Sequence, residues 1–160
     1  MFVNKVPFFV TKSRKNFQFT SVEALPNRGI ATVNSVLETV LVLYQSRGFF
    51  VDSLFADSEF EPLRPWHLNL NTTATDEHVP DIECHIRTIK DSTRSTYQML
   101  PFCRLPCIML IHLVKNTVFW INAVPTNDGI TRRFSPRYIM TGQHLLATHR
   151  HSLWCLSSNT

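Results

Sequence analysis

Several features that would set a structural class on their own are scarce in this sequence. There are only four cysteines, and no apolar leader precedes the first charged residues, so a framework of oxidised disulfides is not expected. Cys103 and Cys107 lie four positions apart without a second ligand pair nearby, which does not favour a zinc site. The longest apolar stretch, residues 107–124, is interrupted by charged and amide residues and predicts a buried helix rather than a membrane span.

Acidic residues are scarce at both ends of the chain. Residues 1–47 hold six Lys and Arg against two acids, residues 105–160 hold five against one, and residues 48–104 contain nine of the twelve acids. An acidic centre between basic flanks fits a cation site beside a surface that binds a polyanion. A solvated surface with uneven charge accounts for this distribution equally well. The composition, 44% apolar and 18% charged over 160 residues, is that of one globular domain.

The first third of the chain predicts strands and one helix. Strands are expected in four segments, at residues 2–3, 6–11, 17–20 and 49–55. From Thr32 to Tyr44, apolar residues recur at helical spacing, and Gly48 supplies a natural stop. Because a strand follows this helix at once, we expect a crossover to parallel pairing.

The second half of the chain predicts two long helices after a short strand at residues 68–73. Pro80 fits the first turn of a helix in which one face is formed by Ile82, Ile86, Ile89, Thr93, Tyr97 and Leu100. The second helix, residues 106–123, is mostly apolar and is therefore expected to be mostly buried, with Phe119 and Trp120 in the core. Residues 144–160 lose this patterning, so the domain is expected to span residues 1–143.

Two acids stand at positions where carboxylates often carry chemistry. Asp57 follows the predicted strand 49–55, and Glu83 lies in the first turn of the helix that begins at Pro80. Carboxylates in such places are suited to divalent cations, because Mg²⁺ prefers hard oxygen ligands. In the alternative interpretation, Asp57 caps a strand and Glu83 stabilises the helix dipole without any ligand role.

A basic stripe follows Glu83 along the same helix. Arg87, Lys90 and Arg94 stand at positions i, i+3 and i+7 and therefore share one helix face. Such a stripe is able to follow a phosphate backbone, which gives weak binding to DNA without sequence preference. The alternative is an ordinary solvated helix face, and His85 is expected on the surface as well.

Three motifs in this order resemble the catalytic core of copia-type (Ty1/copia-like) retrotransposon integrases across residues 1–143. Residues 57–60, Asp-Ser-Glu-Phe, resemble a shortened form of that family's "D-N-G-x-E-F" strand end. Residues 83–88 resemble its "A-E-R-x-N-R-T" helix, and residues 135–142 resemble the segment that closes its core. The order of predicted elements matches the RNase H-like architecture of retroviral-type integrases.

The resemblance implies a fold, a chemistry and a set of partners. The expected fold is α/β, an RNase H-like mixed sheet with an antiparallel meander and then parallel strands, flanked by helices. Asp57 and Glu83 are implied as catalytic residues and as ligands of Mg²⁺ or Mn²⁺, in a two-metal polynucleotidyl transfer that integrates DNA. Arg87, Lys90 and Arg94 are implied as DNA contacts. Oligomers and a nuclear or cytoplasmic location are expected from the same resemblance.

The sequence departs from this family at points that bear on activity. The first acid of the family's set lies on the first strand, whereas residues 1–10 contain no Asp or Glu, so the resemblance implies a partial first strand. Ser58 replaces the family's Asn, and the 25 residues between Asp57 and Glu83 are fewer than usual. We therefore expect metal binding to be weak or absent and this chain to be inactive. The alternative is a non-catalytic nucleic-acid-binding or structural remnant of a mobile element.

Overall fold

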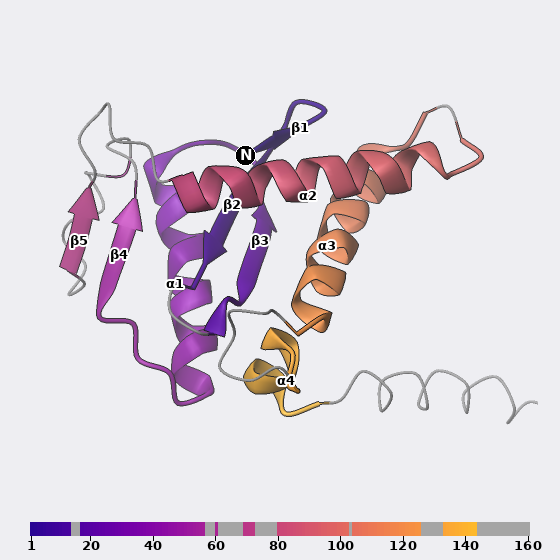
Figure 1. Cartoon of the computed structure of the whole chain (residues 1–160). Helices are drawn as coiled ribbons and strands as arrows, with labels where there is room; N and C mark the ends of the chain where they lie inside the picture. Colours follow the sequence, from indigo (N-terminus) through magenta and orange to yellow (C-terminus); the bar gives the residue numbers. More distant parts are fainter. Residues whose placement is uncertain are drawn as a thin grey trace, which may run out of the picture. The chain divides into compact units, whose positions relative to one another are not determined.

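The computed structural model describes residues 1–13, 17–56, 60, 69–72, 80–102, 104–125 and 133–143 (Figure 1). The chain divides into two compact units. The first unit comprises Met1–Thr11 and Ser21–Val118, and the second comprises Lys12–Thr20 and Phe119–Thr160. The strands are β1 (Phe2–Val3), β2 (Val6–Lys12), β3 (Thr20–Ala24), β4 (Ser53–Ala56) and β5 (Asn69–Thr72). The helices are α1 (Ile30–Ser46), α2 (Pro80–Gln98), α3 (Cys107–Ala123) and α4 (Pro136–Thr141).

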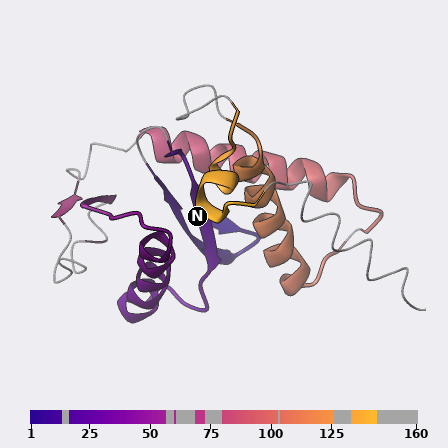
Figure 2. The same cartoon turned by 90° about the horizontal axis from the view of Figure 1, so that it is seen from below.

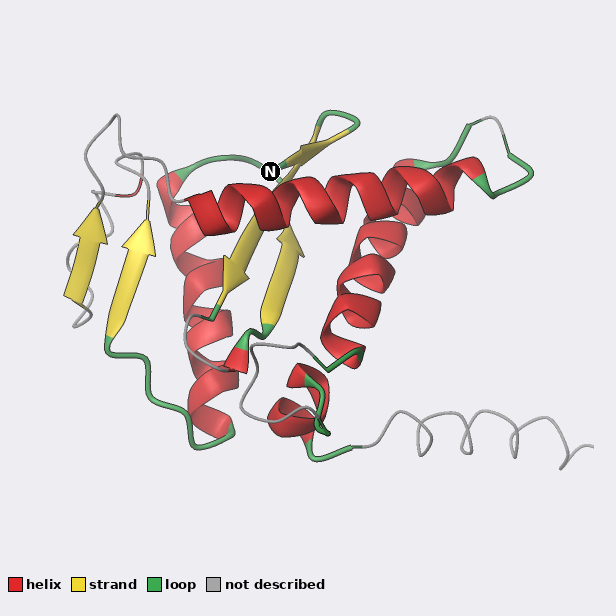
Figure 3. Ribbon diagram, in the orientation of Figure 1, coloured by secondary structure: helices red, strands yellow, loops and turns green. Residues whose placement is uncertain are grey.

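The first three strands form the expected antiparallel meander, in the order β1-β2-β3 (Figure 3). Asn4 and Lys5 make the turn between β1 and β2, and both have positive φ angles, 47° and 69°. Two consecutive left-handed residues match the right-handed twist of the flanking strands, which is why such turns join hairpins. The N–H of Leu25 donates to the C=O of Pro7 at 2.9 Å and holds the end of β3 against β2.

The third strand begins later than the sequence predicts. A strand was expected at residues 17–20, but β3 runs from Thr20 to Ala24. Gln18 has a φ of 46°, and this left-handed residue interrupts the extended backbone that the alternation of Phe17 and Phe19 predicts. The two rings instead stack on each other, with centroids 5.9 Å apart.

β4 and β5 form a separate parallel pair, with Ser53 opposite Asn69 and Ala56 opposite Thr72. The described strands therefore make two sheets, one antiparallel and one parallel, and not the single mixed sheet that was expected. β4 is shorter than the predicted strand 49–55, because Phe49 to Asp52 have no strand partner among the described residues. β5 falls within the predicted strand at 68–73.

Helix α1 follows the predicted pattern closely. Val33, Leu37, Val40 and Tyr44 are buried, which is the stripe that the helical spacing predicts. The helix ends before Gly48, whose φ of 79° is a left-handed conformation that favours glycine, and whose N–H donates to the C=O of Gln45. Within the first unit, α1 and α2 lie on opposite faces of β2 and β3 (Figure 2).

The core beneath α1 joins both sheets. Leu25, Val33 and Leu37 form a buried cluster, and Phe9 of β2 and Leu54 of β4 pack against it. The ring of Phe60 meets the ring of Phe9 edge-on, with centroids 6.0 Å apart. Burying apolar surface of this kind contributes roughly 25 cal/mol per Å².

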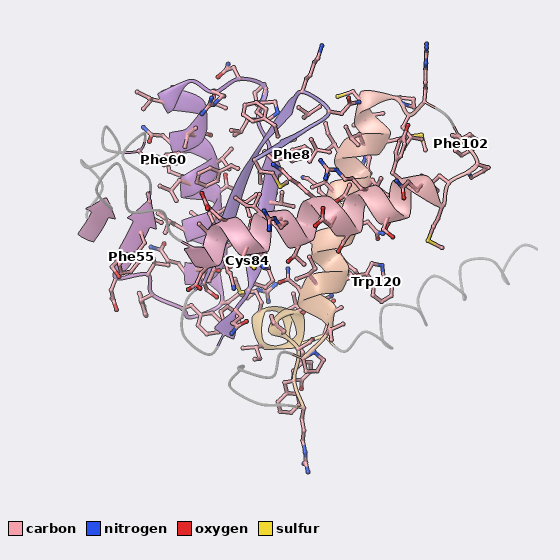
Figure 4. The ribbon with its side chains drawn as sticks, turned by 45° about the horizontal axis from the view of Figure 1, so that its top comes forward. Phe8, Phe55, Phe60, Cys84, Phe102 and Trp120 are labelled. Atoms are coloured by element: carbon pink, nitrogen blue, oxygen red, sulfur yellow. The ribbon has the colours of Figure 1, made fainter. Side chains whose placement is uncertain are left out.

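Helix α3 is less buried than the sequence predicts. Leu110, Val114 and Val118 are buried, but Ile108 and Met109 are exposed, and Trp120 keeps 48% of its surface in solvent. Figure 4 shows Trp120 projecting from the helix. Apolar residues surround α3, but neighbouring elements cover only one side of it, so the apolar side chains on its other side stay exposed. Phe119 is half-buried.

The second unit contains α4, a helix that periodicity did not predict. Ser135 caps its N-terminus by accepting the N–H of Tyr138 on its side chain at 3.2 Å, and Pro136 occupies the first turn. Gly142, with a φ of 68°, ends the helix and donates its N–H to the C=O of Tyr138. The guanidinium of Arg137 lies 4.3 Å from the centroid of the Phe119 ring, a cation–π contact.

Candidate nucleic-acid interface on helix α2

Helix α2 carries most of the residues that the sequence singles out, and its rotation is fixed by its buried face. Ile89 is fully buried and Thr93 nearly so, and the other members of the predicted apolar face are half-buried. The hydroxyl of Thr93 donates to the hydroxyl of Thr117 on α3 at 3.3 Å. Thr117 in turn donates to the C=O of Leu113 at 3.0 Å. The predicted face is confirmed, and the opposite side of α2 is left to solvent.

The first turn of α2 is acidic. Asp81 and Glu83 both lie in it, and both are exposed. Their carboxylates stand at the positive end of the helix dipole, which stabilises a helix by about 0.3–1 kcal/mol per charge. Cys84 follows Glu83 and is an exposed free thiol near this end of α2 (Figure 4).

The basic stripe reaches solvent at two of its three positions. Arg87 and Arg94 are exposed, whereas Lys90 is half-buried and lies at the border of the apolar face. Arg94 Nη1 lies 3.5 Å from Asp91 Oδ1, and these side chains are 73% and 63% exposed. An ion pair so exposed contributes little and leaves the guanidinium accessible to another anion. His85, expected on the surface, is half-buried.

The other half of the predicted metal site cannot be placed beside Glu83, because Asp57 lies outside the described residues. Within the described ranges, no three His, Cys, Asp or Glu side chains gather in a group that could hold a metal ion. Cys107, like Cys84, is a free and exposed thiol, and Cys103 and Cys155 fall outside the described residues. None of the helices in the described part is long and apolar enough to cross a membrane.

Two polar contacts made by α2 and α3 were not predicted from the sequence. One is the Thr93–Thr117 hydroxyl pair, and the other is the ion pair in which Lys115 of α3 lies 2.7 Å from Glu23 of β3. Both join residues far apart in the chain, so no local pattern could have revealed them. The caps of α4 could have been found, since Ser135-Pro136 and Gly142 are the start and stop signals of a helix.

Comparison with known proteins shows which known fold the chain resembles. No family model and no curated protein matches the chain. Among solved structures, the chain is similar to the catalytic core domain of BIV integrase, with a TM-score of 0.57 and 14% sequence identity. The similarity covers 93% of this chain and 91% of that one. At this identity the likeness concerns the fold alone, which resembles that of an integrase catalytic core, and it does not distinguish retroviral integrases from the copia type.

Proposed function

We propose that this chain is an integrase-core-type domain, of the copia type indicated by its sequence motifs, that binds DNA through α2. The observation that carries the proposal is the similarity to an integrase catalytic core over 93% of the chain. The three sequence motifs occur in the order found in the copia-type family, and two of them lie at least partly in described helices, α2 and α4. The proposal concerns DNA binding, because the described residues include the basic side chains of α2 but not Asp57.

The basic stripe of α2 supplies the contact. Arg87 and Arg94 are exposed on the side opposite the buried face, and Lys90 lies at its border, within reach of the same phosphate backbone. Each neutralised phosphate releases condensed counterions, so three contacts give a log–log salt slope of about −2.7 on duplex DNA. Contacts of this kind carry no base information, and the binding is therefore non-specific.

The described residues do not by themselves fit a two-metal centre. Such a centre needs several hard oxygen ligands around two closely spaced cations. Glu83 supplies one exposed carboxylate, Asp57 is outside the described residues, and no acid occurs in residues 1–10. We propose that this chain neither cuts nor joins DNA.

The experiment compares two triple variants that remove the same charge. The first replaces Arg87, Lys90 and Arg94 with Ala, and the second replaces Arg47, Arg104 and Arg133, which are exposed elsewhere. Binding to a duplex is measured by fluorescence anisotropy between about 50 and 200 mM salt, where a three-phosphate difference is easily resolved. The proposal expects the first variant to lose most of the salt slope and the second to keep it.

Equal losses in both variants would show that overall charge, and not α2, drives binding. No change in either variant would leave only the alternative function, a structural remnant without a DNA surface. Circular dichroism of both variants serves as the folding control, because all six substitutions affect exposed or half-buried side chains.

A further inference from the structure

Four aromatic residues and an arginine form a cluster in the second unit. The ring of Trp120 meets the ring of Phe119 edge-on, with centroids 5.5 Å apart. The guanidinium of Arg137 lies 4.3 Å from the centroid of the same Phe119 ring. Tyr138 follows Arg137 on α4, and its ring stacks on that of Phe134 with centroids 4.7 Å apart. We call these five residues the aromatic cluster; all of them belong to the second unit.

Two rings of the aromatic cluster are open to solvent. Trp120 keeps 48% of its surface exposed and projects from α3 (Figure 4), and Phe134 keeps 38%. The ring contacts with Phe119 and Tyr138 hold these two side chains in place, so a ligand that stacks on them costs little side-chain entropy. Flat rings that are both held and exposed are suited to a ligand with planar groups.

The charge of the second unit favours an anionic ligand. Residues 12–20 hold three Lys and Arg and residues 119–160 hold four, against a single acid, Asp128. No carboxylate of the described residues pairs with Arg137, and its Nε is a buried donor without a hydrogen-bond partner among them. The contact with Phe119 does not neutralise the guanidinium. A ligand that is both anionic and built of planar groups therefore matches this surface.

We propose that the aromatic cluster binds single-stranded nucleic acid. Bases stack on Trp120 and Phe134, and a backbone phosphate contacts Arg137. The strand must be unpaired, because the bases of a duplex are stacked on one another and offer no free face. Such stacking tolerates any sequence, since every base has a π face. A second copy of this unit fits the surface less well, because it would bring the same excess of positive charge. The proposal does not rest on duplex binding by α2.

The test follows the fluorescence of Trp120 while the full chain is titrated with an oligothymidylate of about twelve nucleotides, a length within the range of known single-strand sites. Trp66 and Trp154 lie outside the described residues and are replaced with Phe, which leaves Trp120 as the only tryptophan. A base that stacks on the indole is expected to quench its emission. Heparin, a polyanion without bases, is expected to leave the emission unchanged. Quenching by oligothymidylate or by oligouridylate supports the proposal, and the tighter of the two shows whether the site prefers DNA or RNA.

Variants of the full chain test each contact through the affinity for a labelled oligothymidylate. Trp120→Ala is expected to weaken binding about tenfold, and Trp120→Phe, which keeps a ring, to restore most of it. Phe102→Ala is the matched control, because Phe102 is an exposed ring of the first unit, and it is expected to change nothing. Arg137→Gln is expected to lower the log–log salt slope by about 0.7, as one phosphate contact to a single strand does.

No quenching, equal quenching by heparin, or equal losses from Trp120→Ala and Phe102→Ala would overturn the proposal. A blue shift of the Trp120 emission that grows with protein concentration, without any oligonucleotide, would show that a second copy covers the ring, and would overturn it as well. If Trp120→Ala does not fold, the titration of the chain that keeps Trp120 still decides the question. Trp120→Ala is expected to keep its affinity for a duplex, so this proposal and the one for α2 fail separately.

Discussion

The side-chain amide of Asn122 exchanges two hydrogen bonds with the backbone of Thr20. Its Oδ1 accepts the Thr20 N–H at 2.9 Å, and its Nδ2 donates to the Thr20 C=O at 2.7 Å. Both residues are buried within the second unit. The amide thereby completes the hydrogen bonds of the first residue of β3, as a neighbouring strand would.

Replacing Asn122 with Asp is expected to destabilise the protein by about 2–4 kcal/mol. The new carboxylate still accepts the Thr20 N–H but has no donor for the Thr20 carbonyl, and it is a charge in a buried place. Urea unfolding followed by circular dichroism measures the loss. Asn116→Asp on an exposed position of the same helix is the matched control and is expected to change stability by less than about 0.5 kcal/mol. Equal effects of the two substitutions would contradict the role assigned to the buried amide.

The hydroxyl pair between α2 and α3 predicts a non-additive double substitution. Thr93→Val and Thr117→Val each keep the shape of the side chain and remove one partner of the Thr93–Thr117 hydrogen bond. Thr117→Val leaves the buried Thr93 hydroxyl without its acceptor, at about 1–2 kcal/mol, whereas after Thr93→Val the Thr117 hydroxyl still donates to the C=O of Leu113 and the cost is smaller. The double variant removes both hydroxyls together. We expect the double variant to cost less than the sum of the singles. Strict additivity in a double-mutant cycle would show that the two hydroxyls do not interact.

Glu83 is expected to weaken DNA binding in this chain rather than to support turnover. Its exposed carboxylate precedes Arg87 by four residues on one helix face, so it repels phosphate. Glu83→Gln should raise DNA affinity by about twofold to fivefold, as expected for one exposed charge interaction. Asp81→Asn, in the same turn but on another face, should change affinity much less.

Nicking and strand-transfer assays on the same variants, with Mg²⁺ or Mn²⁺ present, are expected to show no product. Cutting or joining of DNA by the parent chain that Glu83→Gln abolishes would contradict the proposal that this chain is inactive.

Local patterns predicted the helices well and the contacts between them poorly. The stripe of α1, its stop at Gly48 and the apolar face of α2 follow from 3.6-residue periodicity and from one glycine, and the structure bears them out. The burial of α3 depends on which neighbours reach it, which no local pattern contains. The partners of Asn122 and Thr117 lie 102 and 24 positions away, so their hydrogen bonds are set by the tertiary fold alone.

The candidate site was predictable only in part for a similar reason. The spacing of Arg87, Lys90 and Arg94 places them on one face, but their accessibility depends on how α2 turns its apolar face toward the core. Lys90 lies at the border of that face and is half-buried, and His85 is half-buried as well. Whether Asp57 and Glu83 converge is a question of tertiary structure, and their convergence stays a prediction.

The central claim is that α2 contacts DNA, and two native thiols allow it to be tested directly. Cys84 stands three residues before Arg87 on α2, Cys107 begins α3, and both are exposed. Two single-cysteine chains, with the remaining cysteines replaced by serine, are labelled with the same photoactivatable cross-linker and irradiated with a duplex. Our account predicts a DNA adduct from Cys84 at low salt that is lost when Arg87 and Arg94 are replaced by Ala, and little adduct from Cys107. Equal adducts from the two positions, or an adduct from Cys107 alone, would contradict it.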